Sequence, residues 1–234
     1  MKHIRYSIFL FFCCCFIACS KQQAVPWTPL FDGHSLNGWE LRNGTASYNV
    51  KDGEIVGITT FGSPNTFLCT TEIFSDFILE FEVMVDSSIN SGVQIRSNSD
   101  PTYNKGLVHG YQVEIDPSKR AWSGGIYDEG RRGWLYNLEN NDFGRQAFKN
   151  GMFNHYRIEA IKNHLKVWVN GIQTANLKDD MTKNGFIGLQ VHSIQDSTHI
   201  GKEIRWKNIN IISEKPELYT LKEAASIDLK EITN

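Results

Sequence analysis

Apolar and polar residues alternate along three separate segments of the chain. Val93 and Ile95 have polar neighbours, and the same period of two returns at residues 111–116 and 189–192. This is the period of a β-strand, whose successive side chains point to opposite faces of a sheet. Each segment is therefore predicted to be a strand with one buried and one polar face. The polar positions are Gln94 and Arg96, then Gln112, Glu114 and Asp116, then Gln190 and His192.

The chemistry of these polar positions favours a functional face. One half-exposed antiparallel strand commonly shows such alternation, because one side of its sheet meets water. Here the polar positions hold amides, carboxylates, a guanidinium and an imidazole, with almost no Lys or Thr. The composition favours a ligand-binding or catalytic face, and a solvated sheet surface is the alternative.

The rest of the chain up to residue 213 also has strand character. Asp52-Gly53 is a hairpin signal between two apolar runs, and Asn170-Gly171 is the pair best suited to a type I′ turn. No segment before residue 214 has ten or more residues of helical periodicity, so the predicted class is all-β. Predicted strands include residues 47–50, 54–59, 76–85, 154–161, 164–169, 185–192 and 203–211.

The number of predicted strands sets the architecture. About twelve strands with short turns require two packed sheets, because one open sheet of that size curls or exposes its edges. The best match is the jelly-roll sandwich of two curved antiparallel sheets found in concanavalin A-like lectins and glucanases.

The N-terminus has the features of an export signal. Lys2 and Arg5 precede an apolar run over residues 8–17, which is too short to span a bilayer. The run ends in Phe-Ile-Ala-Cys-Ser, which resembles a bacterial lipobox with Cys19 as the lipidated residue. We therefore expect a protein of the bacterial cell envelope, held by a lipid anchor through Cys19 on the periplasmic side or at the outer-membrane surface.

These features divide the chain. The C-terminal residues place apolar side chains at roughly helical spacing among charges, which predicts a short amphipathic helix or a frayed end. The predicted parts are a signal peptide (1–18), the lipidated cysteine and its tether (19–26), one β-sandwich domain (27–213) and a C-terminal extension (214–234).

Charge and cysteine content exclude several classes. The chain has 24 Lys and Arg against 26 Asp and Glu, and it lacks a long basic run, so a nucleic-acid partner is not expected. Four of the five cysteines lie within residues 13–19, which leaves Cys69 alone in the domain. An intramolecular disulfide is then impossible, and Cys69 is predicted to be a small buried residue.

Glu114 and Asp116 are the first candidates for catalysis. Residues two apart on a strand lie about 6.5–7 Å apart, so their carboxylates disturb each other's titration. One can then remain protonated while the other is ionised, which supplies an acid and a base. The structural alternative is an ion-pair network with Arg96 or Lys119.

Arg96 and His192 are the other predicted catalytic residues. A guanidinium binds carbonyls or an oxyanion with planar geometry. An imidazole carries protons near neutral pH or ligates a metal, although a strand histidine is often structural. His192 is therefore a candidate proton carrier or metal ligand.

The segment 121–136 is rich in Trp, Tyr, Gly and Arg. Loops of this composition on rigid sheets commonly carry binding residues. Trp122 and Tyr127 are candidates for stacking on a sugar ring, with Arg131 as a polar contact, although the later aromatic residues could equally cap the sandwich. The chain has no HExxH, CxxC, Walker or GxSxG motif, so the corresponding enzyme classes have no support.

Several motifs follow one another in order over nearly all of residues 28–212. They are LFDGHSLNGWE (30–40), YNVKDGEIVG (48–57), FSDFILEFEVMVDSSINSGVQIRS (74–97), GYQVEID (110–116), SGGIYD (123–128), NHYRIEAIKNHLKVWVNG (154–171), GFIGLQVHS (185–193) and IRWKNINI (204–211). Together these motifs resemble one bacterial family, the 3-keto-disaccharide hydrolase domain.

The resemblance implies the same sandwich and a reaction on carbohydrate. Its named chemistry is cleavage of glycosides oxidised to a ketone at C3, where the C2 proton is acidic and its removal can expel the group at C1. Such a route needs a base, an electrophile at the ketone oxygen and an acid. The expected base is Glu114 or His192, and Arg96 is expected to stabilise the enolate. On the same hypothesis a divalent ion, with Asp116, Glu114 and His192 as candidate ligands, is a further group at the enolate. Gln94, Gln112 and Gln190 are expected to bind hydroxyls.

Two positions depart from the commoner family pattern. Val191 stands where an acidic residue is frequent, and Gln112 stands where Glu is frequent. Both changes remove a carboxylate from or beside the expected metal site. The competing interpretation is a carbohydrate-binding surface lipoprotein that has the same fold and no turnover.

Overall fold

The computed structural model describes residues 24–221. The predicted signal peptide, the lipidated Cys19 and most of the C-terminal extension lie outside this range. Within residues 24–221, none of the helices has the length and apolar character needed to cross a bilayer.

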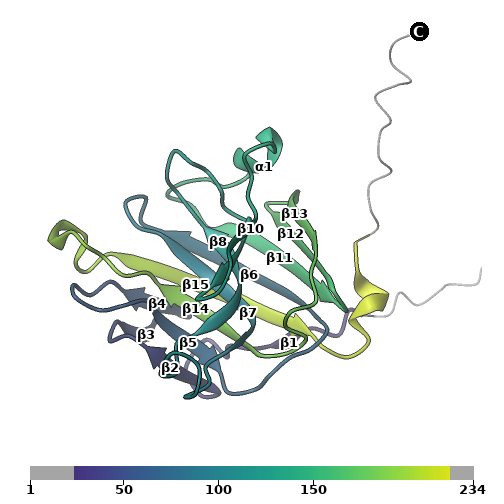
Figure 1. The fold of residues 1–234 in the computed structure, drawn as a ribbon, viewed down its shortest axis with the longest axis horizontal. Coiled ribbons are helices and arrows are strands. Elements are labelled where there is room, and N and C mark those ends of the chain that lie inside the picture. The colour runs from purple at the N-terminus through teal and green to yellow at the C-terminus, as the bar shows by residue number, and fades with distance from the viewer. Residues whose placement is uncertain (1–23, 222–234) are drawn as a thin grey trace, which may run out of the picture.

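Two antiparallel sheets make up the fold and confirm the predicted all-β sandwich (Figure 1). The eight-stranded sheet runs β13 (Ile172–Lys178), β12 (His164–Val169), β11 (Asn154–Ile161), β6 (Phe77–Val85), β15 (Glu203–Ile212), β4 (Glu54–Ile58) and β3 (Ser47–Lys51), with β1 (Thr28–Pro29) paired to β15. The seven-stranded sheet runs β10 (Gly133–Tyr136), β9 (Ile126–Glu129), β8 (His109–Ile115), β7 (Ser91–Asn98), β14 (Phe186–Val191), β5 (Thr66–Thr70) and β2 (Trp39–Asn43).

The core lies between the two sheets and follows the period-two pattern. On β6, Phe77, Leu79 and Phe81 are buried against the other sheet, whereas Glu80 and Glu82 point outward and are half-buried. From the facing sheet, Val93 and Val113 are fully buried. Burial of this much apolar surface is the main favourable term in folding, at roughly 25 cal/mol per Å².

Two predicted hairpin turns have the backbone geometry that their sequences require. In Asp52-Gly53 both residues have positive φ, of 54° and 77°, and the turn joins β3 to β4. In Asn170-Gly171 the φ angles are 49° and 80°, between β12 and β13. A type I′ turn needs positive φ at both positions, which Asn, Asp and Gly tolerate best.

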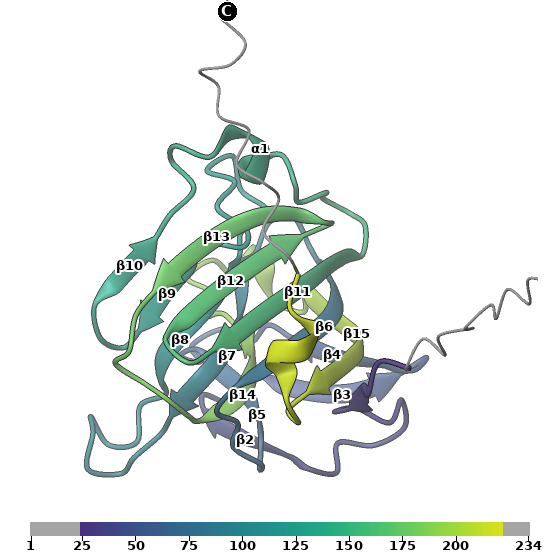
Figure 2. The ribbon, with the colours of Figure 1, turned by 90° about the vertical axis from the view of Figure 1, so that its right-hand side faces the viewer.

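The helical segments are short. Their bounds are α1 Asp142–Arg145 and the 3₁₀ turns η1 Ser197–His199 and η2 Pro216–Tyr219. In Figure 2, η2 lies against the outer face of the eight-stranded sheet. There Arg157 Nη2 donates to the Tyr219 carbonyl at 2.7 Å, and the Leu221 amide donates to Glu159 Oε1 at 2.7 Å. The described start of the C-terminal extension is thus a docked turn.

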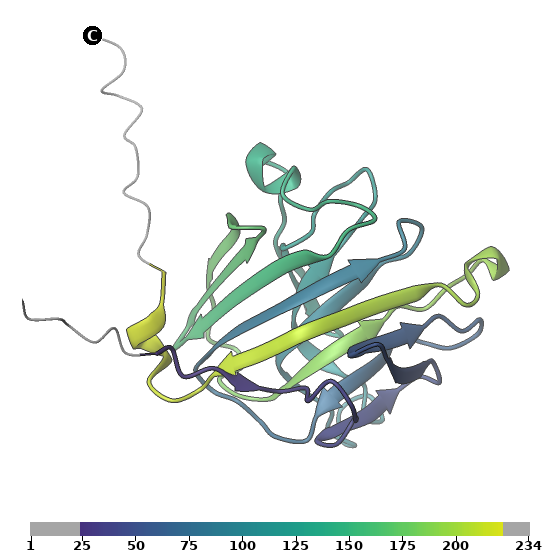
Figure 3. The same cartoon turned by 180° about the vertical axis from the view of Figure 1, so that it is seen from behind.

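The N-terminal end of the described chain reaches the same sheet. β1 pairs with the last residues of β15, as Figure 3 shows from behind. Both ends of the described chain, residues 24 and 221, therefore lie near the eight-stranded sheet. The predicted polar residues lie on the other sheet, whose outer face is formed by strands and loops from the middle of the chain.

Candidate functional site

A polar hollow of about 460 Å³ opens on the outer face of the seven-stranded sheet. This size is typical of small-molecule sites. The residues that line this polar hollow are Asn65, Asn90, Gln112, Glu114, Arg120, Tyr127, Glu129, Trp134 and His192. The structure therefore brings together Gln112, Glu114, Tyr127 and His192, as the sequence predicted.

Glu114 is the central acidic group of the polar hollow. Its Oε1 accepts hydrogen bonds from Asn90 Nδ2 at 2.6 Å and Arg120 Nη2 at 3.2 Å, and its Oε2 accepts one from Gln112 Nε2 at 3.0 Å. Burial raises the pKa of Glu114 to about 7, although the hydrogen bonds from Asn90 and Gln112 favour the charged form. The carboxyl group therefore exchanges protons near neutral pH.

Arg120 is the cation beside this acid. Its Nε donates to Asp116 Oδ2 at 2.7 Å while Nη2 reaches Glu114. Burial alone would raise the pKa of Asp116, but hydrogen bonds from Ser118 and Arg120 outweigh it and lower that pKa. The pKa values of Glu114 and Asp116 are thus separated, but the main causes are the burial of Glu114 and the donors around Asp116, not the spacing from which the separation was predicted. Their partner is Arg120 instead of the predicted Arg96 or Lys119.

A row of amides supports the floor of the polar hollow. Gln94 Nε2 and Gln190 Nε2 both donate to Gln112 Oε1, at 2.7 Å and 2.8 Å, which turns the Gln112 amide nitrogen toward Glu114. Gly92 makes room for this arrangement, since a Cβ there would lie 2.6 Å from Gln112 Cδ. Gln94 and Gln190 are fully buried. Contrary to expectation, they position Gln112 instead of meeting a ligand themselves.

His192 and Glu129 are tied together through Asn65. His192 Nδ1 lies 2.7 Å from the Ser193 carbonyl, which can only accept, so a neutral ring carries its proton on Nδ1. The described residues make no hydrogen bond to Nε2. Asn65 Oδ1 accepts from the Ser193 amide at 2.9 Å, and its Nδ2 donates to Glu129 Oε1 at 3.2 Å.

Aromatic rings form one side of the polar hollow. Tyr127 and Trp134 pack edge to face with centroids 5.3 Å apart, and Trp122 packs on Trp134 at 4.8 Å. The Arg120 guanidinium lies 4.9 Å from the Trp122 ring and 5.1 Å from the Trp134 ring. Tyr127 and Trp134 therefore line the polar hollow, whereas Trp122 packs on Trp134 and is not part of the lining. An aromatic surface of this kind suits a sugar ring.

The family comparison agrees with this arrangement. The model of the 3-keto-alpha-glucoside-1,2-lyase-like domain matches residues 26–212. The chain belongs to this family. The resemblance predicted from the sequence is thus confirmed, and the family description makes the domain carbohydrate-active. No curated protein matches the chain significantly.

Solved structures share the fold of this lyase-like domain at low identity. A protein from Parabacteroides distasonis, provisionally assigned as a glycosyl hydrolase, is 18% identical with a TM-score of 0.59, over 80% of this chain and 93% of that one. The carbohydrate-binding module CBM66 from Bacillus subtilis is 15% identical with a TM-score of 0.54, over 75% and 96%. A β-1,3-1,4-glucanase from a mouse hindgut metagenome is 16% identical with a TM-score of 0.51, over 75% and 92%.

Arg96 does not lie in the polar hollow of this lyase-like domain, so its predicted role is wrong. The pairing of β7 with β8 shifts register between Ile95 and Asn98, and Arg96 has a φ of 46°. Such a bulge re-aims a side chain. The fully buried guanidinium donates to the carbonyls of Ser75, Lys162 and Ala160, with bonds of 2.6 Å and 2.8 Å to the last two.

Arg131 also points away from the polar hollow, contrary to expectation. Its Nε donates to Asp128 Oδ1 at 2.8 Å, and its guanidinium lies 5.6 Å from the centroid of Tyr111. Asp128 is fully buried and also pairs with Arg132. This network fixes β9 from the side opposite Tyr127 and Glu129, so Arg131 has a structural role.

The predicted metal site is not assembled. Among residues 24–221, no group of three or more His, Cys, Asp and Glu side chains lies close enough to hold a metal ion. Asp116 is held by Arg120 and Ser118, and the three hydrogen bonds to Glu114 come from donors that a metal would replace. These residues do not fit a divalent ion.

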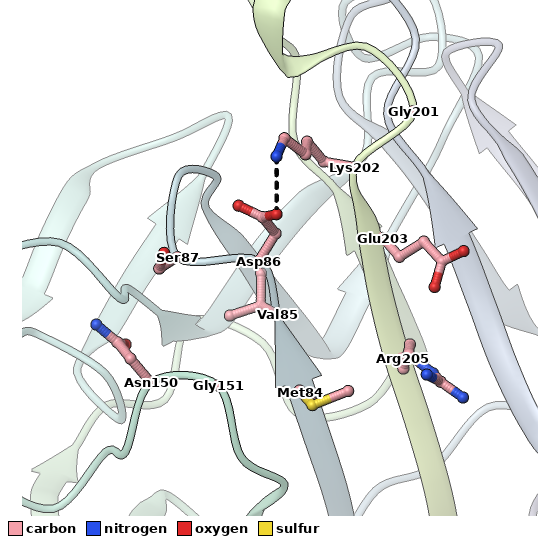
Figure 4. A pocket seen from close by; sticks show the side chains of 10 residues that line it. All are labelled: Met84, Val85, Asp86, Ser87, Asn150, Gly151, Gly201, Lys202, Glu203 and Arg205. Carbon is pink, nitrogen blue, oxygen red and sulfur yellow. Dashed lines mark hydrogen bonds and ion pairs between the residues drawn. The ribbon is translucent and has the colours of Figure 1, made fainter.

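A second hollow, of about 670 Å³, lies at one end of the eight-stranded sheet (Figure 4). Lys202 Nζ donates to Asp86 Oδ2 at 3.0 Å across it. Hydrogen bonds from Ser88 lower the pKa of Asp86 to about 2, so this carboxylate stays charged near neutrality. The described residues supply no acid and base pair of perturbed pKa there, so the polar hollow is the better candidate for the functional site.

Sequence reasoning missed several residues of the polar hollow. Asn65, Asn90 and Arg120 lie on loops, and only the folded chain brings them to the sheet. Glu129 had a usable signal, since it stands two residues after Tyr127 and therefore on the same face of β9. Cys69, predicted to be buried and inert, is fully buried, and burial raises its pKa.

Proposed function

We propose that the protein cleaves the glycosidic bond of 3-keto-glycosides or disaccharides by removing the C2 proton and expelling the C1 substituent, followed by addition of water. The observation that carries the proposal is Glu114, a buried carboxyl with a pKa of about 7 beside a cation in a sugar-sized polar hollow. A base of this acidity is well matched to proton abstraction at neutral pH.

The hydrogen bonds of Glu114 define the oxygen that takes the proton. Oε1 already accepts from Asn90 and Arg120, whereas Oε2 accepts only from Gln112 among residues 24–221. Oε2 therefore has the lone pair that faces the C2 hydrogen. The ketone at C3 is one bond away from C2, so the group that stabilises the enolate must stand next to the base. Arg120 does so, in the role first expected of Arg96.

The remaining side chains hold the sugar. Gln112 and the Nε2 of His192 are placed to bind hydroxyls, and Tyr127 and Trp134 offer ring faces. His192 was an alternative base in the sequence-based hypothesis. Glu114 is the better candidate because it directly contacts the cation that the enolate needs.

The reaction should depend on pH through Glu114. The active base is the carboxylate, so kcat/KM should rise as pH increases through about 7 and fall tenfold per pH unit well below it. Steady-state rates between pH 5 and 9 with a 3-keto-glycoside measure this rise of kcat/KM with pH. A rate that stays constant down to pH 5 would exclude Glu114 as the base.

The direct test is release of product from oxidised substrates. Purified protein is incubated with 3-keto-trehalose and with a 3-keto-β-glucoside, with and without divalent metal, and release of free sugar or aglycone is followed. We expect release from at least one substrate, and none from the corresponding unoxidised sugars, whose C2 proton is not acidic. Binding without release from any oxidised sugar would instead support the alternative of a non-catalytic carbohydrate-binding lipoprotein.

A further inference from the structure

Glu129 is a second acidic group of the polar hollow, in surroundings unlike those of Glu114. The only hydrogen bond to its side chain from the described residues comes from Asn65 Nδ2, and no cation among them pairs with it. Glu114, by contrast, has three donors including Arg120. A half-buried carboxyl without a cation favours its neutral form.

We propose that Glu129 is the general acid that protonates the leaving oxygen of the glycoside. The inference rests on the function proposed above and assigns to Glu129 the acid that this reaction requires. The carboxyl lines the same polar hollow as Glu114, and Asn65 donates only to its Oε1, which leaves Oε2 to carry a proton toward a ligand.

Other observations agree with this placement. Burial raises the pKa of Glu129, with the hydrogen bond from Asn65 opposing the shift. The pKa of the Tyr127 hydroxyl is raised by burial and then by the charges of Glu129 and Glu114, so the ring lies near both carboxyls. The two acids stand on β8 and β9, with Tyr127 and Gln112 as neighbours across the strands. A sugar against Tyr127 would thus have one acid toward each end.

Each proton and electron pair can be followed through one turnover. Glu114 takes the C2 proton, and the electron pair of the C2–H bond forms the enolate. When the C1–O bond breaks, its electron pair stays on the leaving oxygen, which takes the proton of Glu129, and a C1=C2 double bond remains conjugated with the C3 ketone. Water then adds its oxygen to C1 while giving a proton to Glu129, and Glu114 returns a proton to C2. Both carboxyls end as they began.

The test compares two leaving groups in Glu129→Gln. The substrates are the 3-keto forms of methyl and 4-nitrophenyl glucosides, each as both anomers. Methoxide needs a proton to leave, whereas nitrophenolate is a stable anion. We expect Glu129→Gln to lower kcat about 10²–10³-fold on the methyl glycoside and less than about tenfold on the nitrophenyl glycoside. Loss of the Glu129 proton at high pH should slow the wild-type enzyme on the methyl glycoside, and this decline should be absent from Glu129→Gln.

Controls separate this proposal from the proposed function. Glu139→Gln, an exposed position on the loop after β10, should behave as the wild type on both substrates. Thermal melting verifies folding, and if Glu129→Gln is unfolded, Glu129→Asp carries the same comparison with a smaller selective loss. Equal losses on both glycosides, or no loss, overturn the role of Glu129 while the wild-type activity stands. If the wild type cleaves neither glycoside, both proposals fall.

Discussion

Replacing Glu114 by glutamine is expected to lower kcat by about 10²–10⁴-fold, the usual contribution of a positioned general base. Glutamine keeps the size of the side chain and an Oε1 that accepts from Asn90 and Arg120, but its Nε2 cannot accept from Gln112 and it cannot take the C2 proton. Release of product from a 3-keto-glycoside measures the loss. Affinity for the substrate should change much less than the rate, because the polar hollow keeps its shape.

The same variant should also change how the stability of the fold depends on pH. The pKa of Glu114 rises from 4.5 to about 7 on folding, so the folded state binds the proton more tightly than the unfolded chain. Glu114 therefore does not reduce the free energy of unfolding below about pH 4.5. As pH rises to about 7 it lowers that free energy progressively, by about 3 kcal/mol in total. Glu114→Gln removes this cost, so its stability relative to the wild type should improve between pH 4.5 and 8.

Two measurements check this assignment together. Denaturant unfolding at pH 4.5 and 8 gives the change in relative stability, and the rate assay gives the loss of turnover. Glu139→Gln serves as the control, because its exposed side chain should change neither quantity. A Glu114→Gln variant that retains more than about a tenth of the wild-type kcat would contradict the role of base.

Replacing Arg96 by methionine is expected to destabilise the fold by about 3–5 kcal/mol. The change leaves the carbonyl oxygens of Ser75, Ala160 and Lys162 without the guanidinium that they share. The bond to the Ala160 carbonyl is buried and the other two are partly buried, and a buried acceptor that loses its donor costs about 1–3 kcal/mol. Urea denaturation followed by tryptophan fluorescence measures the loss as a lower midpoint.

The matched control is Asp76→Asn, on the other side of the ion pair. Asp76 Oδ1 accepts from Arg96 Nη2 and from the Lys162 amide, both at 2.9 Å, and asparagine retains that oxygen. The Asp76 side chain is 38% exposed, and Asp76→Asn leaves Arg96 all three of its carbonyl acceptors, so it should destabilise the fold less than Arg96→Met does. If Arg96→Met is as stable as the wild type but inactive, the structural role of Arg96 is contradicted and a catalytic role is supported.

The sequence was sufficient for the fold and for the central strand of the site. The period of two on β8 placed Gln112 and Glu114 on one face, and the structure places both in the polar hollow. The hairpins at Asp52-Gly53 and Asn170-Gly171 followed from the few residues that accept positive φ. These features are local, so neighbouring residues determine them.

The rest depended on geometry that no local pattern carries. Arg96 fits the alternation of its strand, but the bulge after Ile95 turns its side chain to the other sheet, and a φ of 46° at an arginine has no signature in the sequence. Arg120 enters the polar hollow only because the loop after β8 folds back onto the strand. Asn65 reaches Glu129 across 64 positions of chain.

The buried amides beneath the polar hollow form a chain of hydrogen bonds that runs in one direction. An ionised Glu114 can only accept, so Gln112 must offer its nitrogen to Glu114 Oε2 and its oxygen to the nitrogens of Gln94 and Gln190. The Gln94 oxygen then accepts from Ser97 Oγ at 2.7 Å. The charge on Glu114 thus sets the orientation of buried amides as far as a hydroxyl at the bulge, which has no part in the lining.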